Sequence, residues 1–104
     1  MLVWSPLESV LNRSGKAALV TVVVTRGSSP REAGARMIVP PDGTFTGTIG
    51  GGMLEWKAIA KSRSYLSDPE ATRAAVRGFA LGPELGQCCG GHVDLLFELF
   101  GRRR

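Results

Sequence analysis

One run of nine residues, AALVTVVVT at positions 17–25, constrains the fold of this chain more than any other feature. The run is almost wholly apolar and rich in β-branched residues, which favour an extended backbone. A strand with one face in water alternates polar and apolar side chains, whereas an unbroken apolar run is typical of a strand that is covered on both faces. The sequence therefore predicts a central strand at 17–25 with other structure packed on each side of it.

The segments on either side of this run predict further strands and two helices. A short amphipathic helix is expected over about residues 6–14, and Gly15 suits its C-terminal end. A longer helix follows the glycines at 50–52, because apolar residues recur there at helical spacing, and Asp68-Pro69 ends it. The expected strands are 17–25, 35–39, 44–49, 71–81 and 92–100, with a turn at 41–43. Segment 71–81 is ambiguous, since its alanines favour a helix and its other residues a strand; we assign it as a strand.

The order of these elements describes one domain. The 104 residues contain no internal repeat and no linker, and a chain of this length forms a single core. We expect an α/β single domain. It would consist of a mixed sheet of about five strands, a long helix after a glycine-rich loop and a short N-terminal helix.

Composition and charge argue against two classes of partner. No stretch approaches the ~18–20 apolar residues that span a bilayer, so we expect no membrane association. The net charge of +4 includes the three terminal arginines, and there is no basic stripe interleaved with aromatic residues, so we expect no nucleic acid. The N-terminus lacks the pattern of a signal peptide, and two neighbouring cysteines make no disulfide framework. We therefore expect a cytoplasmic protein.

Three consecutive glycines stand where a strand passes into the long helix, in the stretch GTIGGGMLEW. Such a loop can expose backbone N–H groups at the positive end of the helix dipole, where anions are favoured. The alternative is a tight turn that packs backbone on backbone. The loop after the central strand, with Arg26, Ser28, Ser29, Arg31 and Arg36, offers donors for a phosphate or another oxyanion.

Both cysteines lie side by side in LGQCCGGHVD, within a glycine-rich turn. A structural zinc site needs four ligands, commonly in two separated pairs, which this chain does not supply. Three interpretations of the cysteine pair stay open: a nucleophilic thiol with His92 as its base, a strained and labile vicinal disulfide, or an inert buried pair. Cys88 and Cys89 would also suit a soft metal centre that a larger ligand presents.

Read together, TRGSSPREAGARMIV, GTIGGGMLEWKAI and QCCGG followed by LLFE resemble the N-terminal domain of the XdhC/CoxI family, over about Ala17 to Glu98. Met53 follows the glycines where the CoxI branch tends to carry a cysteine, so the chain is more similar to the XdhC branch. Members are accessory factors of xanthine dehydrogenase and related molybdenum hydroxylases. The resemblance implies a chaperone rather than an enzyme. It would bind the molybdenum cofactor (molybdopterin), protect it while it is sulfurated, and deliver it to the apo-enzyme.

The resemblance also implies a cofactor site. Cys88 and Cys89 would approach molybdenum or its sulfur ligand, and Glu55 would either bond the amino-pyrimidine edge of the pterin or simply favour the helix dipole. The residues assigned to the cofactor are Arg26, Ser28, Ser29, Arg31, Gly50, Gly51, Gly52, Glu55, Gln87, Cys88 and Cys89.

Typical family members continue into a C-terminal Rossmann-like domain, which we expect to be absent from residues 1–104. The expected partners are an apo molybdenum hydroxylase, a cysteine desulfurase, a separate Rossmann-like chain and a second copy in a homodimer. A thiol-dependent redox sensor or enzyme that uses Cys88 and Cys89 is the alternative function. A regulatory module whose partner carries the ligand site is a third.

Overall fold

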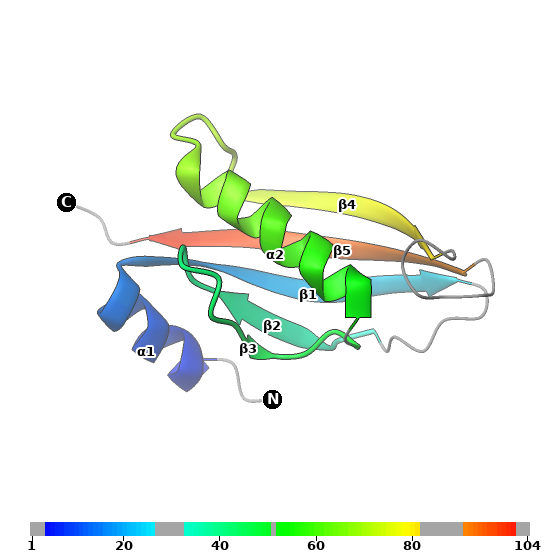
Figure 1. Cartoon of the computed structure of the whole chain (residues 1–104), viewed down its shortest axis with the longest axis horizontal. Coiled ribbons are helices and arrows are strands. Elements are labelled where there is room, and N and C mark those ends of the chain that lie inside the picture. Colours follow the sequence, from blue (N-terminus) through cyan, green and yellow to red (C-terminus); the bar gives the residue numbers. More distant parts are fainter. Residues whose placement is uncertain (1–3, 27–32, 51, 82–90, 102–104) are drawn as a thin grey trace.

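The computed structural model describes residues 4–26, 33–50, 52–81 and 91–101, with side chains for all but 24–26, 81 and 91 (Figure 1). The expected order of helices and strands is confirmed. The elements are α1 (Trp4–Ser14), β1 (Lys16–Arg26), β2 (Arg36–Val39), β3 (Thr46–Gly47), α2 (Gly52–Ser67), β4 (Ala74–Leu81) and β5 (Gly91–Gly101). The ambiguous segment 71–81 thus contains a strand, β4. Neither described helix is long and apolar enough to cross a membrane.

The five strands form one sheet in the order β3-β2-β1-β5-β4, and every neighbouring pair is antiparallel. The expectation of a mixed sheet is wrong. A parallel pair needs a crossover between neighbouring strands. Here the long helix α2 instead joins β3 at one edge of the sheet to β4 at the opposite edge, so it creates no parallel neighbours (Figure 1).

The main core lies between α2 and one face of the sheet. Alternate residues of β1 and β5 point into it, among them Val20, Leu95 and Phe97, and all three are fully buried. The Phe97 ring meets Tyr65 of α2 edge to face, with ring centroids 5.5 Å apart. The side of α2 that completes the core carries Leu54, Ala58, Ser62 and Leu66.

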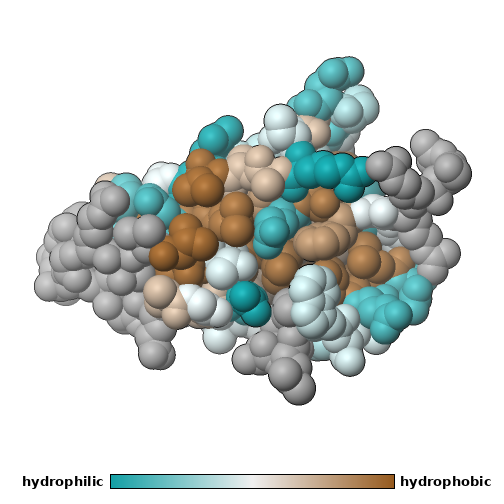
Figure 2. Space-filling model, turned by 180° about the vertical axis from the view of Figure 1, so that it is seen from behind, coloured by the Kyte–Doolittle hydropathy of each residue, from teal (hydrophilic) through white to brown (hydrophobic). Residues whose placement is uncertain are grey.

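The opposite face of the sheet is covered in part by α1. Leu7 and Val10 of this helix pack against Ala17 and Leu19 of β1 and against Ile38 of β2. Both faces of β1 are therefore buried in this region, as its unbroken apolar run predicts. Figure 2 shows that apolar side chains lie in several patches across the middle of the same side of the molecule.

The third strand is much shorter than the expected 44–49. The Asp42 carboxylate accepts hydrogen bonds from the N–H and hydroxyl of Thr44, at 2.9 and 2.6 Å, which holds the start of the segment in a turn. At its end, the Ile49 N–H donates to the Glu55 side chain of α2 and not to β2. The ladder with β2 is limited to Thr46 and Gly47, and the Thr48 N–H adds one hydrogen bond to the Arg36 carbonyl oxygen of β2 at 3.1 Å. The strand extends no further because Thr44 and Ile49 are bound by side chains from outside it.

Candidate functional site

Parts of the three sequence motifs lie toward one end of the sheet. β1 ends at Arg26, which pairs with His92 of β5, while Leu81 at the end of β4 pairs with Gly91. The Arg/Ser segment therefore follows β1, and the cysteine segment connects β4 to β5, the strand next to β1. Figure 1 shows the N-terminus of α2 directed toward this same end of the sheet.

The glycine-rich loop has the backbone geometry that glycine permits. Gly50 and Gly52 have φ values of 119° and 72°, in the region that side chains disfavour. Gly52 is the first residue of α2, and a Cβ atom built there would meet no atom within 4 Å. The space beside this residue is open, and the first turn of a helix leaves N–H groups without intrahelical partners.

Glu55 secures this loop from within α2. Its Oε2 atom accepts hydrogen bonds from the Ile49 N–H, at 3.0 Å, and from the Thr48 hydroxyl. The Thr48 hydroxyl oxygen in turn accepts from the Gly50 N–H at 3.1 Å. The Gly50 N–H and one oxygen of Glu55 are therefore already engaged within the protein. The donors that face a ligand would be those of the first turn of α2.

The structure covers only part of the residue set expected from the sequence. Gly50, Gly52 and Glu55 are brought together at the start of α2, and the backbone of Arg26 ends β1. The remaining predicted residues lie outside the described ranges and stay predictions: Ser28, Ser29, Arg31, Gly51, Gln87, Cys88 and Cys89. Within the described ranges, no three His, Cys, Asp or Glu side chains are close enough together to hold a metal ion.

A contact between two polar side chains, which was not expected from the sequence, lies on β5, next to the cysteine segment. The Nε2 atom of His92 is 2.7 Å from Oδ1 of Asp94, and the two side chains are 35% and 22% exposed. A Cβ atom on Gly78 of the neighbouring strand would lie 2.9 Å from Cε1 of His92. Because Gly78 has no side chain, there is space for His92 and Asp94 at this position. Spacing of two along a strand places both side chains on one face, which was the signal available in the sequence.

A groove runs along the outer side of α2, and we name it the α2 groove. It has a volume of about 570 Å³ and lies between the helix and the β2–β3 connection. Its lining includes Asp42, Phe45, Met53, Trp56, Ile59 and Arg63. Met53, Trp56 and Ile59 recur at helical spacing and line this groove, and Ile59 also packs against the main core.

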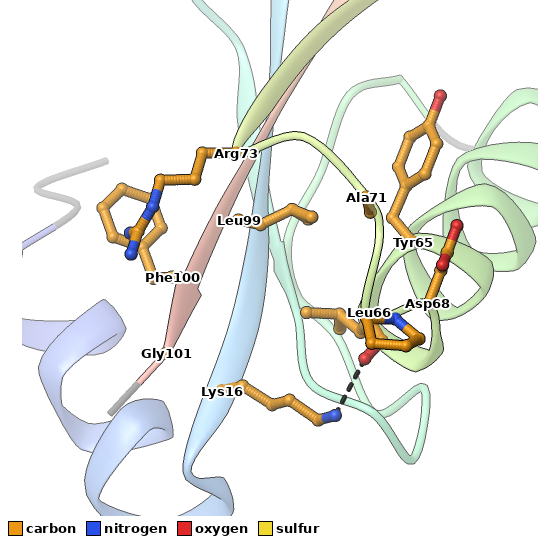
Figure 3. A pocket seen from close by; sticks show the side chains of 10 residues that line it. Lys16, Tyr65, Leu66, Asp68, Ala71, Arg73, Leu99, Phe100 and Gly101 are labelled. Carbon is orange, nitrogen blue, oxygen red and sulfur yellow. Dashed lines mark hydrogen bonds between the residues drawn. The ribbon is translucent and has the colours of Figure 1, made fainter. Parts of the chain in front are cut away.

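A second cavity, of about 600 Å³, lies at the opposite end of α2 (Figure 3). Lys16 reaches from the start of β1, and its Nζ atom donates to the Leu66 carbonyl oxygen at 2.8 Å. An ammonium group at this position satisfies a carbonyl in the last turn of α2 and matches the negative end of the helix dipole. We interpret the polar groups of this cavity as structural.

Comparison with known proteins decides the family. Residues 10–77 match the XdhC and CoxI family, which is more than half of the chain. The chain belongs to the XdhC and CoxI family. This XdhC and CoxI family member is 37% identical, over 87 residues, to the uncharacterized protein YqeB of Escherichia coli strain K12. Its fold matches a protein from Bacillus halodurans described as a xanthine dehydrogenase, with a TM-score of 0.72, 25% identity and 91% of this chain covered.

Both relatives are much longer than this XdhC and CoxI family member. The matched region is 16% of YqeB and 29% of the Bacillus halodurans chain. The match with the solved structure therefore supports the family and the fold of one domain. What the rest of those longer proteins does is a separate question.

Proposed function

We propose that this chain is an accessory protein that binds the molybdenum cofactor, protects it while it is sulfurated, and delivers it to a xanthine dehydrogenase-type hydroxylase. Membership of the XdhC and CoxI family supports this role, as does the likeness to a protein described as a xanthine dehydrogenase. The observation that carries the proposal is the glycine-rich loop at the start of α2, a helix whose N-terminus is directed toward the end of the sheet where the Arg/Ser and cysteine segments begin (Figure 1). In this role the chain holds and transfers a ligand and has no turnover of its own.

The residues of this region fit the chemistry of the cofactor. Its terminal phosphate would be favoured at the N-terminus of α2, where N–H groups and the helix dipole present partial positive charge. Gly50 and Gly52, with Gly51 between them, let the backbone come close to a ligand, and the space beside Gly52 is open. Arg26 and Arg31, with Ser28 and Ser29, would add donors to the same phosphate.

The cysteine segment would face the molybdenum centre of the cofactor. When bound, the cofactor supplies the molybdenum centre and the sulfur ligand that the hydroxylase later uses. Thiolates are soft ligands that suit such a centre, so we assign Cys88 and Cys89, with Gln87, to it. The recipient hydroxylase is the proposed partner. The cysteine desulfurase, a separate Rossmann-like chain and a homodimer stay predictions.

Co-purification tests the role of the cysteine pair. The wild-type chain, purified from cells that make the cofactor, should carry pterin and molybdenum. The double variant Cys88→Ser, Cys89→Ser should fold normally and retain at least about tenfold less sulfurated cofactor, since loss of one good contact weakens binding by roughly that factor. Equal molybdenum content in both proteins would contradict the assignment. Unfolding of the double variant would show instead that the pair belongs to the core.

A thiol-dependent redox activity is the second candidate, and the contact between His92 and Asp94 favours it. A carboxylate on one ring nitrogen orients an imidazole and leaves the other nitrogen to accept a proton. If His92 serves a thiol, alkylation of the cysteines across pH should show a thiol pKa well below about 8.5, and Asp94→Asn should raise it. A thiol that titrates at its ordinary value in both proteins would exclude this function.

A further inference from the structure

The side of α2 that faces the α2 groove carries large apolar side chains that the core leaves exposed. Leu54, Ala58 and Leu66 already cover the sheet. Trp56 is nevertheless 71% exposed, and Met53 and Phe45 are each 45% exposed at the α2 groove. Large apolar side chains gathered at one concave surface mark a binding site more often than they mark ordinary surface. The volume of about 570 Å³ lies in the usual range for small-ligand sites, about 300–1,000 Å³.

One carboxylate at the rim of the α2 groove is held in place and available to a ligand. The Thr44 side-chain and backbone donors both bond Oδ1 of Asp42. No hydrogen bond to its Oδ2 occurs within the part of the chain that the structure describes. The Thr44 hydroxyl and N–H, helped by Arg13 and Arg63, lower the pKa of Asp42, so the group is ionised at neutral pH.

The turn that carries Asp42 is braced by the helix across the groove. The Arg63 Nε atom donates to the Pro41 carbonyl oxygen at 2.8 Å, and Gly43 packs beside the Arg63 side chain. Arg63 thus fixes the position of the Asp42 turn relative to α2, the helix that carries Trp56. Glu55 is less suited to meet a ligand, because its Oε2 atom already binds Thr48 and Ile49.

These groups match a flat heterocycle with two adjacent donors on one edge. Aromatic side chains stack on such rings, and an ionised carboxylate accepts two parallel N–H bonds from an amino group and a neighbouring ring N–H. The aminopyrimidinone edge of a pterin has this pattern. We propose, on the basis of the proposed function, that the pterin ring of the cofactor lies in the α2 groove against Trp56 and Phe45, with its amino edge on Asp42. The phosphate would then extend toward the N-terminus of α2.

Trp56 itself reports on the site. The chain has two tryptophans, so Trp4→Phe, which changes only an exposed side chain of α1, leaves Trp56 as the sole tryptophan. In this background, titration with free pterin should quench the Trp56 emission. Lumazine has a second oxo group where pterin carries its amino group, and we expect it to bind about 10–100-fold more weakly, the range for a hydrogen bond to a charged group. This comparison needs no folding-sensitive variant.

Substitutions test whether Asp42 is the residue that binds the amino edge of the pterin. Asp42→Asn should weaken pterin binding about 10–100-fold and abolish the preference over lumazine. Phe45→Ala should weaken both ligands. The matched control is Asp68→Asn, because the Asp68 carboxylate also accepts a backbone hydrogen bond, from Glu70 at 2.8 Å, but lies away from the groove. Asp68→Asn should leave the Kd for pterin unchanged.

The outcomes separate this inference from the proposed function. Absence of quenching, equal affinity for pterin and lumazine, or an Asp42→Asn variant that binds pterin like its parent would each overturn the inference. If whole cofactor still binds to that variant with unchanged affinity, the cofactor is held elsewhere and the chaperone role survives. If whole cofactor does not bind but pterin binds with dependence on Asp42, the groove assignment survives and the chaperone role fails.

Discussion

Replacing Glu55 with alanine is expected to lower the free energy of unfolding by about 1–3 kcal/mol, the cost of a buried donor left without its partner. The substitution removes the acceptor of the Ile49 N–H and of the Thr48 hydroxyl. Ile49 is fully buried, so its N–H has limited access to water in place of the carboxylate. Urea denaturation followed by circular dichroism measures the difference, with an unchanged m-value expected.

Glu55→Gln is the matched control for this substitution. Its amide oxygen can still accept from Ile49, so it should keep most of the stability. Because the loop carries Gly50 and leads into Gly52, we also expect Glu55→Ala, but not Glu55→Gln, to weaken cofactor binding. Wild-type stability in Glu55→Ala would contradict the role of Glu55 as the anchor of the loop, as would an equal loss in both variants.

Phe97→Ala should have the largest effect on stability, a loss of about 3–5 kcal/mol. Phe97 is fully buried on β5, the strand between β1 and β4, and its ring contacts Tyr65 of α2. Alanine would leave a cavity between the helix and the sheet. Small domains have a total stability of about 5–15 kcal/mol, so a large fraction of the variant would unfold under mild denaturant.

Phe45→Ala is the comparison for Phe97→Ala. The Phe45 side chain is 45% exposed at the α2 groove and outside the main core. Thermal unfolding should show a large drop in Tm for Phe97→Ala and a small one for Phe45→Ala. Similar drops for the two variants would mean that the core does not lie between α2 and the sheet.

Local pattern was enough to predict most of the elements. The apolar run at 17–25 predicted the central strand, and residues 92–100 were also predicted as a strand, on which Val93, Leu95 and Phe97 are buried. Gly15 ends α1 as expected, with a φ of 85° and its N–H bonded to the Leu11 carbonyl oxygen. Such features depend on a few neighbouring residues, so sequence alone reveals them.

Strand direction and the length of β3 could not be predicted in this way. A long helix between strands usually suggests a parallel crossover, and only the three-dimensional arrangement shows that α2 joins the two edges of the sheet. Residues 44–49 look like a full strand. The side chains of Asp42 and Glu55, which bind its two flanks, come from outside it.

In the candidate site, too, the features with a local sequence signal were predicted, and those that depend on contacts between distant segments were not. The glycine-rich loop was predicted, because three consecutive glycines before a helix are a local signal. The role of Glu55 stayed open in the sequence, since a carboxylate in a first turn serves a helix in either case. The α2 groove was not predicted, because it requires the β2–β3 connection to lie beside the outer side of α2. The contact between His92 and Asp94 likewise depends on Gly78 from another strand.

Equilibrium binding of the molybdenum cofactor to the purified chain tests the proposed function most directly. The protein is mixed with cofactor released from a molybdenum enzyme under anaerobic conditions, and the bound and free fractions are separated by ultrafiltration. We expect pterin and molybdenum together in the protein fraction, with a Kd of about 1 μM or tighter, equivalent to roughly 8 kcal/mol of binding free energy. If the protein concentration is well above this Kd and pterin and molybdenum still remain in the free fraction, a cofactor-binding role for this chain is contradicted.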